Sequence, residues 1–129
     1  TEKLSPFMYK KVCHYKYKKL DENLLNEACQ SFLGEHDFSA FCASGATVVS
    51  KVRTIYSASV RREGDMVIFK VRGNGFLYNM VRIMAGTLLY VAEGKINADD
   101  IPSIIKSGDR KKAGITVIPD GLYLNKVFY

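Results

Sequence analysis

The residue that most strongly suggests chemistry is Arg82, the only charged residue between Gly75 and Ala92 in an otherwise apolar stretch. A guanidinium group keeps its proton, so burying it costs several kcal/mol unless a carboxylate or phosphate accepts its hydrogen bonds. The sequence leaves three interpretations open. Arg82 serves an anion-binding site, reaches water from a helix edge, or pairs with a local acid such as Glu93 or Asp109.

Two further motifs carry little chemical information. Gly73-Asn74-Gly75 has the G-x-G pattern but lacks the third glycine of a dinucleotide fingerprint and precedes no complete βαβ unit, so it predicts a turn. His36, Asp37 and Ser39 are near neighbours in one loop, which cannot place a nucleophile, a base and an orienting acid in the geometry of a hydrolase triad.

The cysteines do not favour a metal site. Cys13, Cys29 and Cys42 form no C-x-x-C pair, and only His14 and His36 could add nitrogen ligands. We therefore expect buried or idle thiols and no bound metal. Reduced cysteines, the absence of a visible secretory signal and the lack of a long apolar run together predict a cytoplasmic protein.

The net charge of +6 is concentrated at the start of the chain, because residues 1–20 hold six lysines and one glutamate. A local lysine cluster attracts a phosphate backbone, which makes Lys16 and Lys18 candidates for RNA contacts. The alternative is that these lysines protect an exposed edge strand from aggregation.

The periodicity of the sequence predicts an α+β fold, in which helices pack on one face of an antiparallel sheet. Gly34 should close the first helix at C′, Glu63-Gly64-Asp65 should turn a β-hairpin, and the inward face of its second strand should carry Val67, Phe69 and Val71. Gly108 should end the last helix. The expected strands are 12–18, 52–62, 66–72 and 121–129, the expected helices begin near residues 21, 79 and 97, and residues 34–51 should form a long loop.

Several motifs, in this order and at these spacings, resemble the TruA family of tRNA pseudouridine synthases. The resemblance extends from about Leu20 to Tyr129, and no single motif would suffice for it. The motifs are Gly34-Glu35-His36-Asp37-Phe38-Ser39-Ala40-Phe41, Gly73-Asn74-Gly75-Phe76-Leu77-Tyr78-Asn79-Met80-Val81-Arg82, Gly86-Thr87-Leu88, Asp109-Arg110 and Gly121-Leu122-Tyr123-Leu124.

The resemblance implies a homodimer whose subunits have two similar halves around an RNA-binding cleft. It further implies isomerisation of uridine to pseudouridine in the tRNA anticodon stem-loop, without a cofactor. The family's nucleophilic aspartate belongs to an R-T-D-x-G-V-like motif in the N-terminal half, and Arg53-Thr54-Ile55 is not a substitute for it. Residues 1–129 are then a single C-terminal domain without the nucleophile, expected to be inactive alone.

Site residues transfer from the family one by one. Arg82 matches the arginine that pairs with the catalytic aspartate, and a fixed cation keeps such a carboxylate ionised in a dry pocket. Phe76, Leu77 and Met80 are expected to line the uridine pocket, and Leu124 to approach the base. The competing hypothesis is a non-catalytic RNA-binding or dimerisation module.

Overall fold

The computed structural model of the chain describes residues 9–16, 21–43, 48–64, 66–116 and 122–128. For residues 9–16, 66 and 122–128 it describes the backbone alone. Its five strands form one antiparallel sheet in the order β2-β3-β4-β1-β5. The strands are β1 (Tyr9–Lys16), β2 (Gly34–Asp37), β3 (Val52–Glu63), β4 (Met66–Gly73) and β5 (Leu122–Phe128).

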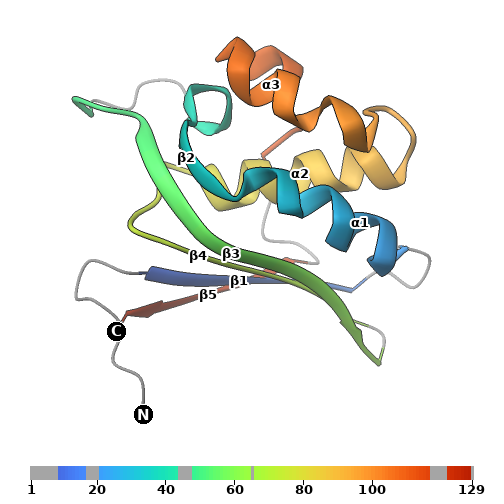
Figure 1. Cartoon of the computed structure of the whole chain (residues 1–129). Coiled ribbons are helices and arrows are strands. Elements are labelled where there is room, and N and C mark those ends of the chain that lie inside the picture. The colour runs from blue at the N-terminus through green and yellow to red at the C-terminus, as the bar shows by residue number, and fades with distance from the viewer. Residues whose placement is uncertain (1–8, 17–20, 44–47, 65, 117–121, 129) are drawn as a thin grey trace.

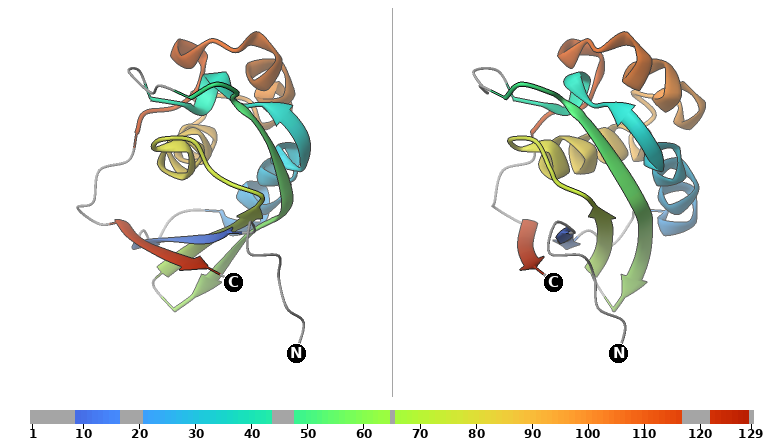
Figure 2. Two further views of the ribbon diagram at one scale, coloured as in Figure 1. Left: turned by 90° about the vertical axis from the view of Figure 1, so that its left-hand side faces the viewer. Right: turned by 60° about the vertical axis from the view of Figure 1, so that its left-hand side comes forward.

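The described helices all lie on one face of this sheet, as the views in Figures 1 and 2 agree. The predicted α+β class is therefore confirmed. The helices are α1 (Glu22–Cys29), α2 (Met80–Ala92) and α3 (Ile101–Ser107), with single 3-10 turns at Gln30–Phe32, Ser39–Phe41, Ala98–Asp100 and Arg110–Lys112. None of the described helices is long and apolar enough to cross a membrane.

Most predicted elements are present, with small shifts at their ends. Asp21 caps α1 by accepting hydrogen bonds from the amides of Asn23 and Leu24, and Gly108 ends α3 with a φ of 63°. The hairpin of β3 and β4 forms as predicted, and Val67, Phe69 and Val71 are buried beneath the helices. The first strand begins at Tyr9, three residues earlier than expected, and its predicted end at residues 17 and 18 lies outside the described residues.

The predicted loop at residues 34–51 is wrong in its first part, because Gly34–Asp37 pairs with β3 and Ser39–Phe41 forms a 3-10 turn. Strand β2 is the sheet edge and no residue in it is fully buried, so it lacks the alternating apolar pattern by which strands are recognised. The expected C′ role of Gly34 is wrong as well. Helix α1 continues through a 3-10 turn to Phe32, and Gly34, with a φ of 99°, starts β2 instead.

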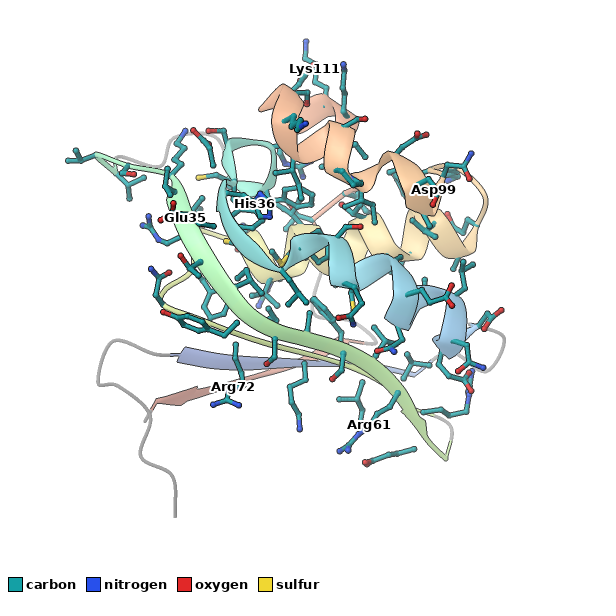
Figure 3. The ribbon with its side chains drawn as sticks, in the orientation of Figure 1. Glu35, His36, Arg61, Arg72, Asp99 and Lys111 are labelled. Carbon is teal, nitrogen blue, oxygen red and sulfur yellow. The ribbon has the colours of Figure 1, made fainter. Side chains whose placement is uncertain are left out.

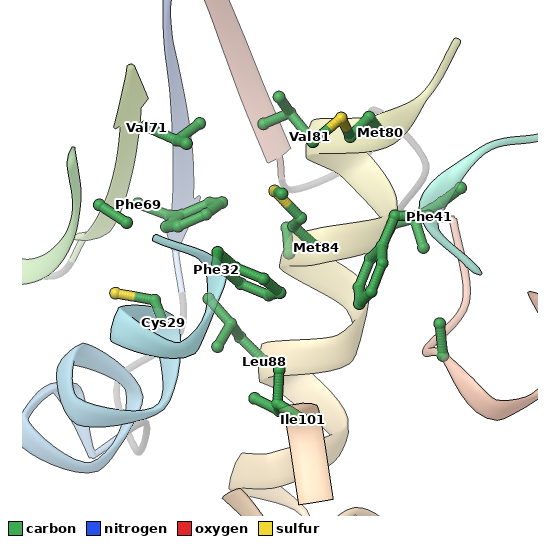
Figure 4. Close-up of a cluster of buried hydrophobic side chains, with 14 of the residues drawn as sticks. Cys29, Phe32, Phe41, Phe69, Val71, Met80, Val81, Met84, Leu88 and Ile101 are labelled. Atoms are coloured by element: carbon green, nitrogen blue, oxygen red, sulfur yellow. The ribbon is translucent and has the colours of Figure 1, made fainter. Parts of the chain in front are cut away.

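The hydrophobic core lies between the sheet and α2. Phe32 meets Phe41 edge to face with ring centroids 5.4 Å apart, and Phe69 reaches the same cluster from β4. Figure 4 shows Met84 and Leu88 of α2 beside these rings. Helix α2 is buried on several sides at once, so it is the central element of the helix layer.

Two glycines allow the chain after α3 to lie directly on the backbone of α2. A Cβ atom on Gly86 would stand 1.8 Å from the carbonyl oxygen of Ile115, and one on Gly114 would stand 2.4 Å from the carbonyl carbon of Gly86. No side chain can occupy either position without moving backbone. The Gly86-Thr87 motif on α2 therefore contacts the segment that follows the Asp109-Arg110 motif.

Hydrogen bonds hold the same contact on both sides. The Thr87 hydroxyl donates to the carbonyl of Ile83 and accepts from the amide of Gly114, each at 2.8 Å. From the other side the Arg110 guanidinium donates to the carbonyl of Gly114 at 2.7 Å and to the hydroxyl of Thr116 at 3.1 Å. The segment 113–116 is thereby fixed to the helix that carries Arg82.

We expect Gly86→Ala to lower the free energy of unfolding by about 3 kcal/mol or more, because the added methyl group overlaps backbone that two sets of hydrogen bonds hold in place. Gly94→Ala is the control, since its Cβ meets nothing within 4 Å and the cost there is only the strain of a φ of 77°, about 1 kcal/mol. Urea unfolding midpoints measure both. Equal losses would show that the close contact does not govern stability.

Candidate functional site

The connection from β4 to α2 is fastened to β3 by the central residue of Gly73-Asn74-Gly75. The Asn74 amide donates to the carbonyl of Thr54 at 3.0 Å, and the Thr54 amide donates to the Asn74 side-chain oxygen at 2.9 Å. A Cβ on Gly73 would stand 2.8 Å from that Thr54 carbonyl, so the position requires glycine. The predicted turn is not formed as such, because Gly73 is the last residue of β4 and the chain only bends at Asn74, where the motif cross-links two strands.

Arg53 supports the same connection from outside. Its Nη1 donates to the carbonyls of Ser50 at 2.8 Å and Val52 at 2.7 Å, and a Cβ on Gly75 would lie 3.5 Å from its Nε. Sequence reasoning examined Arg53 only as part of a possible R-T-D motif and missed this role. The sequence does contain a signal for the fixed connection itself, which is Asn74 between two glycines, because the side chains of such asparagines commonly bond to nearby backbone.

Helix α2 begins at a strained residue. Asn79 has a φ of 59° and is the only non-glycine residue with positive φ among the described residues. Asparagine tolerates this left-handed conformation better than most residues. Just before it, the carbonyl of Tyr78 accepts a hydrogen bond from the amide of Ala43 at 3.1 Å. These contacts fix where the helix starts and so where Arg82, its third residue, is placed.

Arg82 is partly buried, and it makes no ion pair or hydrogen bond within the described part of the chain. The expected alternative of a local acid is wrong. Glu93 pairs with Lys95 at 3.3 Å, and the Asp109 carboxylate accepts from the amide of Lys111 at 2.9 Å. A cation in the first turn of a helix also opposes the helix dipole, at a cost of roughly 0.3–1 kcal/mol. Two interpretations therefore remain, an anion-binding site and contact with water, and the partial exposure of Arg82 is compatible with both.

The predicted pocket residues Phe76, Leu77 and Met80 precede Arg82 by two to six residues in the chain. Phe76 is partly buried, whereas Leu77 is 3% and Met80 0% exposed, and both pack in the core. Figure 4 shows Met80 beside Val81 at the start of α2. These two side chains are core residues and offer no open surface to a ligand. The side chain of the fourth predicted residue, Leu124, lies outside the described residues.

A cavity of about 630 Å³ in the described part of the chain lies elsewhere. It opens among the beginning of α1, the end of α2 and the residues leading into α3, with Leu24, Val91 and Ile104 in its lining. Val91 follows Arg82 by nine residues, about 13 Å along the helix axis. The cavity is therefore separate from the Arg82 region.

The remaining candidates are structural. The His36 ring bonds to the carbonyl of Leu33 at 2.7 Å, whereas Asp37 accepts from both the amide and the hydroxyl of Ser39, so these residues form no triad. Figure 3 shows His36 on β2. Burial raises the pKa of the Cys29 thiol to about 12, which keeps it protonated and poorly suited to bind a metal. Among the described residues no group of three potential ligands is close enough to hold a metal ion.

Comparison with known proteins identifies a family for the fold and for these motifs. The family model described as tRNA pseudouridine synthase matches residues 28–129. The chain is 53% identical to tRNA pseudouridine synthase A of Acetivibrio thermocellus over 111 residues, which cover 86% of this chain and 46% of that protein. It is 48% identical to tRNA pseudouridine synthase A 2 of Clostridium perfringens over 124 residues, which cover 96% of this chain and 51% of that protein.

A third relative, tRNA pseudouridine synthase A of Caldicellulosiruptor bescii, is 41% identical over 129 residues, which are all of this chain and 53% of that protein. The chain thus spans about half the length of the curated relatives it matches. The family match includes α2 with Arg82, the connection that positions it and the contact of Gly86 with segment 113–116. The chain belongs to the tRNA pseudouridine synthase family.

Proposed function

We propose that this chain is the C-terminal domain of a tRNA pseudouridine synthase and supplies the arginine of its uridine site. The observation that carries the proposal is Arg82, a partly buried cation on a rigid helix, with no acidic partner among the described residues. The aspartate that attacks the nucleotide comes from an N-terminal half with an R-T-D-like motif, which this sequence does not contain.

The role of Arg82 follows from electrostatics. A carboxylate is a nucleophile only while ionised, and burial in a dry pocket raises its pKa unless a cation stands beside it. A guanidinium stays charged at every relevant pH and donates two parallel hydrogen bonds to a carboxylate. Because Asn74, Arg53 and the buried body of α2 fix the start of the helix, the cation is held in position before a partner arrives.

The reaction consumes no co-reactant, because uridine and pseudouridine are isomers. The bond from ribose C1′ to uracil N1 breaks, a bond from C1′ to C5 forms, the proton on C5 leaves and N1 gains one. Phe76, with Leu77 and Met80 behind it, supplies apolar surface for the uracil ring, and Leu124 approaches it from the last strand. No cofactor takes part.

The remaining features of the proposal concern partners and place. The substrate is a uridine in the anticodon stem-loop of tRNA, and Lys16 and Lys18 contact its phosphates. The complete enzyme is a cytoplasmic homodimer. The names of the relatives support tRNA as the substrate, and the resemblance of the motifs supports the anticodon stem-loop and the homodimer. The lysine contacts rest on the positive charge of residues 1–20.

We expect the chain alone to release no tritium from tRNA that carries the label on uracil C5, because it lacks the nucleophilic aspartate. The measurement is tritium released into water, with the full-length Clostridium perfringens relative as the positive control. Turnover by the chain alone would show that a residue of this half acts as the nucleophile, which contradicts the assignment of roles.

We expect Arg82→Met to leave the chain as stable as before, or more stable, because no described ion pair is lost and an unfavourable charge leaves the first helical turn. Arg62→Met is the matched control and should lower the urea midpoint, since Arg62 bonds to Glu22 at 3.1 Å. Unfolding of the Arg82 variant would make its role structural.

In a protein that joins this chain to an N-terminal half, Arg82→Met should reduce single-turnover isomerisation on the order of a hundredfold or more, as for the loss of one preorganised electrostatic group. Lys106→Met, at an exposed position of α3, is the control and should leave the rate unchanged. A rate that survives the loss of Arg82 would remove it from the site.

A further inference from the structure

The strands of the sheet carry most of the positive charge that the described secondary structure holds. Together β1, β3, β4 and β5 contain nine lysines and arginines and one acidic residue, Glu63. Acidic residues instead occur on α1, on β2 and at Ala98–Asp100. Strands β1, β3, β4 and β5 are therefore predominantly basic, whereas the edge strand β2 carries acids.

Edge protection does not account for the lysines of β1. That strand lies between β4 and β5 in the sheet, so it presents no unpaired edge to another molecule. The alternative that lysines there deter edge-to-edge aggregation is wrong for this strand. The basic residues of the inner strands need another explanation.

Three basic residues of β3 and β4 share the face of the sheet that has no described helix. Because Val67, Phe69 and Val71 face the helices, strand alternation puts Lys70 and Arg72 on the opposite side. The residues of β3 that pair directly with this side of β4 lie on the same face, because paired residues of neighbouring strands point to the same side of a sheet. We call this surface the open sheet face, which among the residues with described side chains consists of Ser57, Ser59, Arg61, Glu63, Ile68, Lys70 and Arg72.

Figure 3 shows Arg61 and Arg72 pointing from their strands away from the helices. Figures 1 and 2 show the described helices on the other side. Arg82 lies on α2 and hence across the sheet from this surface. The open sheet face and the proposed uridine site are thus two different places on the chain.

Arg72 has a buried hydrogen-bond donor for which the described part of the chain provides no acceptor. Its Nε is buried and has no hydrogen-bond acceptor. Strand β1 places Lys10 directly opposite Arg72 in register, and like charges at paired positions destabilise a sheet. Arg61 is matched only by Glu63, at 2.7 Å on an exposed edge of the hairpin. An external anion would relieve both the repulsion and the unmet donor.

The chemistry of the open sheet face selects a polyanion over a protein partner. Its one described apolar residue, Ile68, is already only 6% exposed, so docking there would remove little apolar area from water. Apart from the Arg61–Glu63 ion pair, the polar groups of this face are the Arg72 guanidinium, the Lys70 ammonium and the hydroxyls of Ser57 and Ser59, which are types of group that contact phosphate and sugar.

We propose that the open sheet face binds the phosphate backbone of RNA, at a distance from the nucleotide that reacts. The proposal rests on the proposed function for the identity of the nucleic acid, because a tRNA is large enough to touch the protein away from the uridine site. Arg72 and Lys70 are the central contacts. Ser57 and Ser59 donate to the same phosphates.

The test is binding of this chain to a fluorescein-labelled RNA stem-loop, measured by anisotropy between about 50 and 200 mM salt. Arg72→Gln together with Lys70→Gln should weaken binding at low salt by on the order of tenfold and reduce the slope of log affinity against log salt by about 2. Lys106→Gln together with Lys111→Gln removes the same charge from the helix layer and should leave the affinity within about twofold.

Two further variants keep the test decisive. Arg72→Lys retains the charge and should keep the salt slope. Arg61→Gln, at a side chain 58% exposed that folding does not require, should lower the slope in the same direction if the double variant unfolds. Absence of RNA binding at low salt, or equal losses from the two double variants, would overturn the proposal.

Other outcomes separate this proposal from the proposed function. If the protein with both halves isomerises uridine and the Arg72→Gln, Lys70→Gln pair leaves KM for tRNA unchanged, the surface is wrong and the function stands. If that protein is inactive but the chain binds RNA through the open sheet face, the function is wrong and the surface stands. Self-association that the same pair abolishes, seen by sedimentation, would assign the face to a second copy and overturn the proposal.

Discussion

The burial of α2 is the constraint on which the rest of this domain depends. Its side chains are apolar on nearly every side, so the sheet, α1 and segment 113–116 must all cover it. Segment 113–116 can do so only because Gly86 and Gly114 have no side chains. With the body of the helix enclosed, its first turn is where a cation still reaches a polar environment, and Arg82 stands there.

The fold also separates two kinds of electrostatics. Around Arg82 the interaction is short-range and needs a rigid frame, which the Asn74–Thr54 cross-link and the buried helix supply. On the open sheet face the charges are spread over neighbouring strands, and such an array attracts a polyanion through counterion release, without fixed geometry. Because the proposed RNA surface and the proposed uridine site lie on opposite sides of one sheet, a substitution in one need not disturb the other.

Local sequence patterns were sufficient for the elements with a clear period. The hairpin of β3 and β4, the buried α2 and the glycine that ends α3 were all predicted, because each has alternating residues, a long apolar run or a specific backbone requirement. The edge strand β2 was missed because no residue in it is fully buried. Gly34 was misassigned because a positive φ serves a strand start as readily as a helix end.

The site was only partly accessible from sequence. Arg82 is visible in the sequence as a lone charge in an apolar run, but the sequence does not show that Glu93 and Asp109 bond to other groups in the fold. The contact of Gly86 with Gly114 joins residues far apart in sequence, as does the Asn74–Thr54 bond. Periodicity describes one segment at a time and carries no information on such pairs.

Partial burial is compatible with the role proposed for Arg82. A fully buried guanidinium without an acceptor would cost several kcal/mol, whereas one at the edge of the core keeps part of its hydration. A carboxylate that docks beside it displaces that water, and the attraction between the charges grows as the effective dielectric falls. On the proposed function, the same position is tolerable in this chain alone and favourable for an ion pair with the N-terminal half. A cation placed deeper in α2 could not satisfy both conditions.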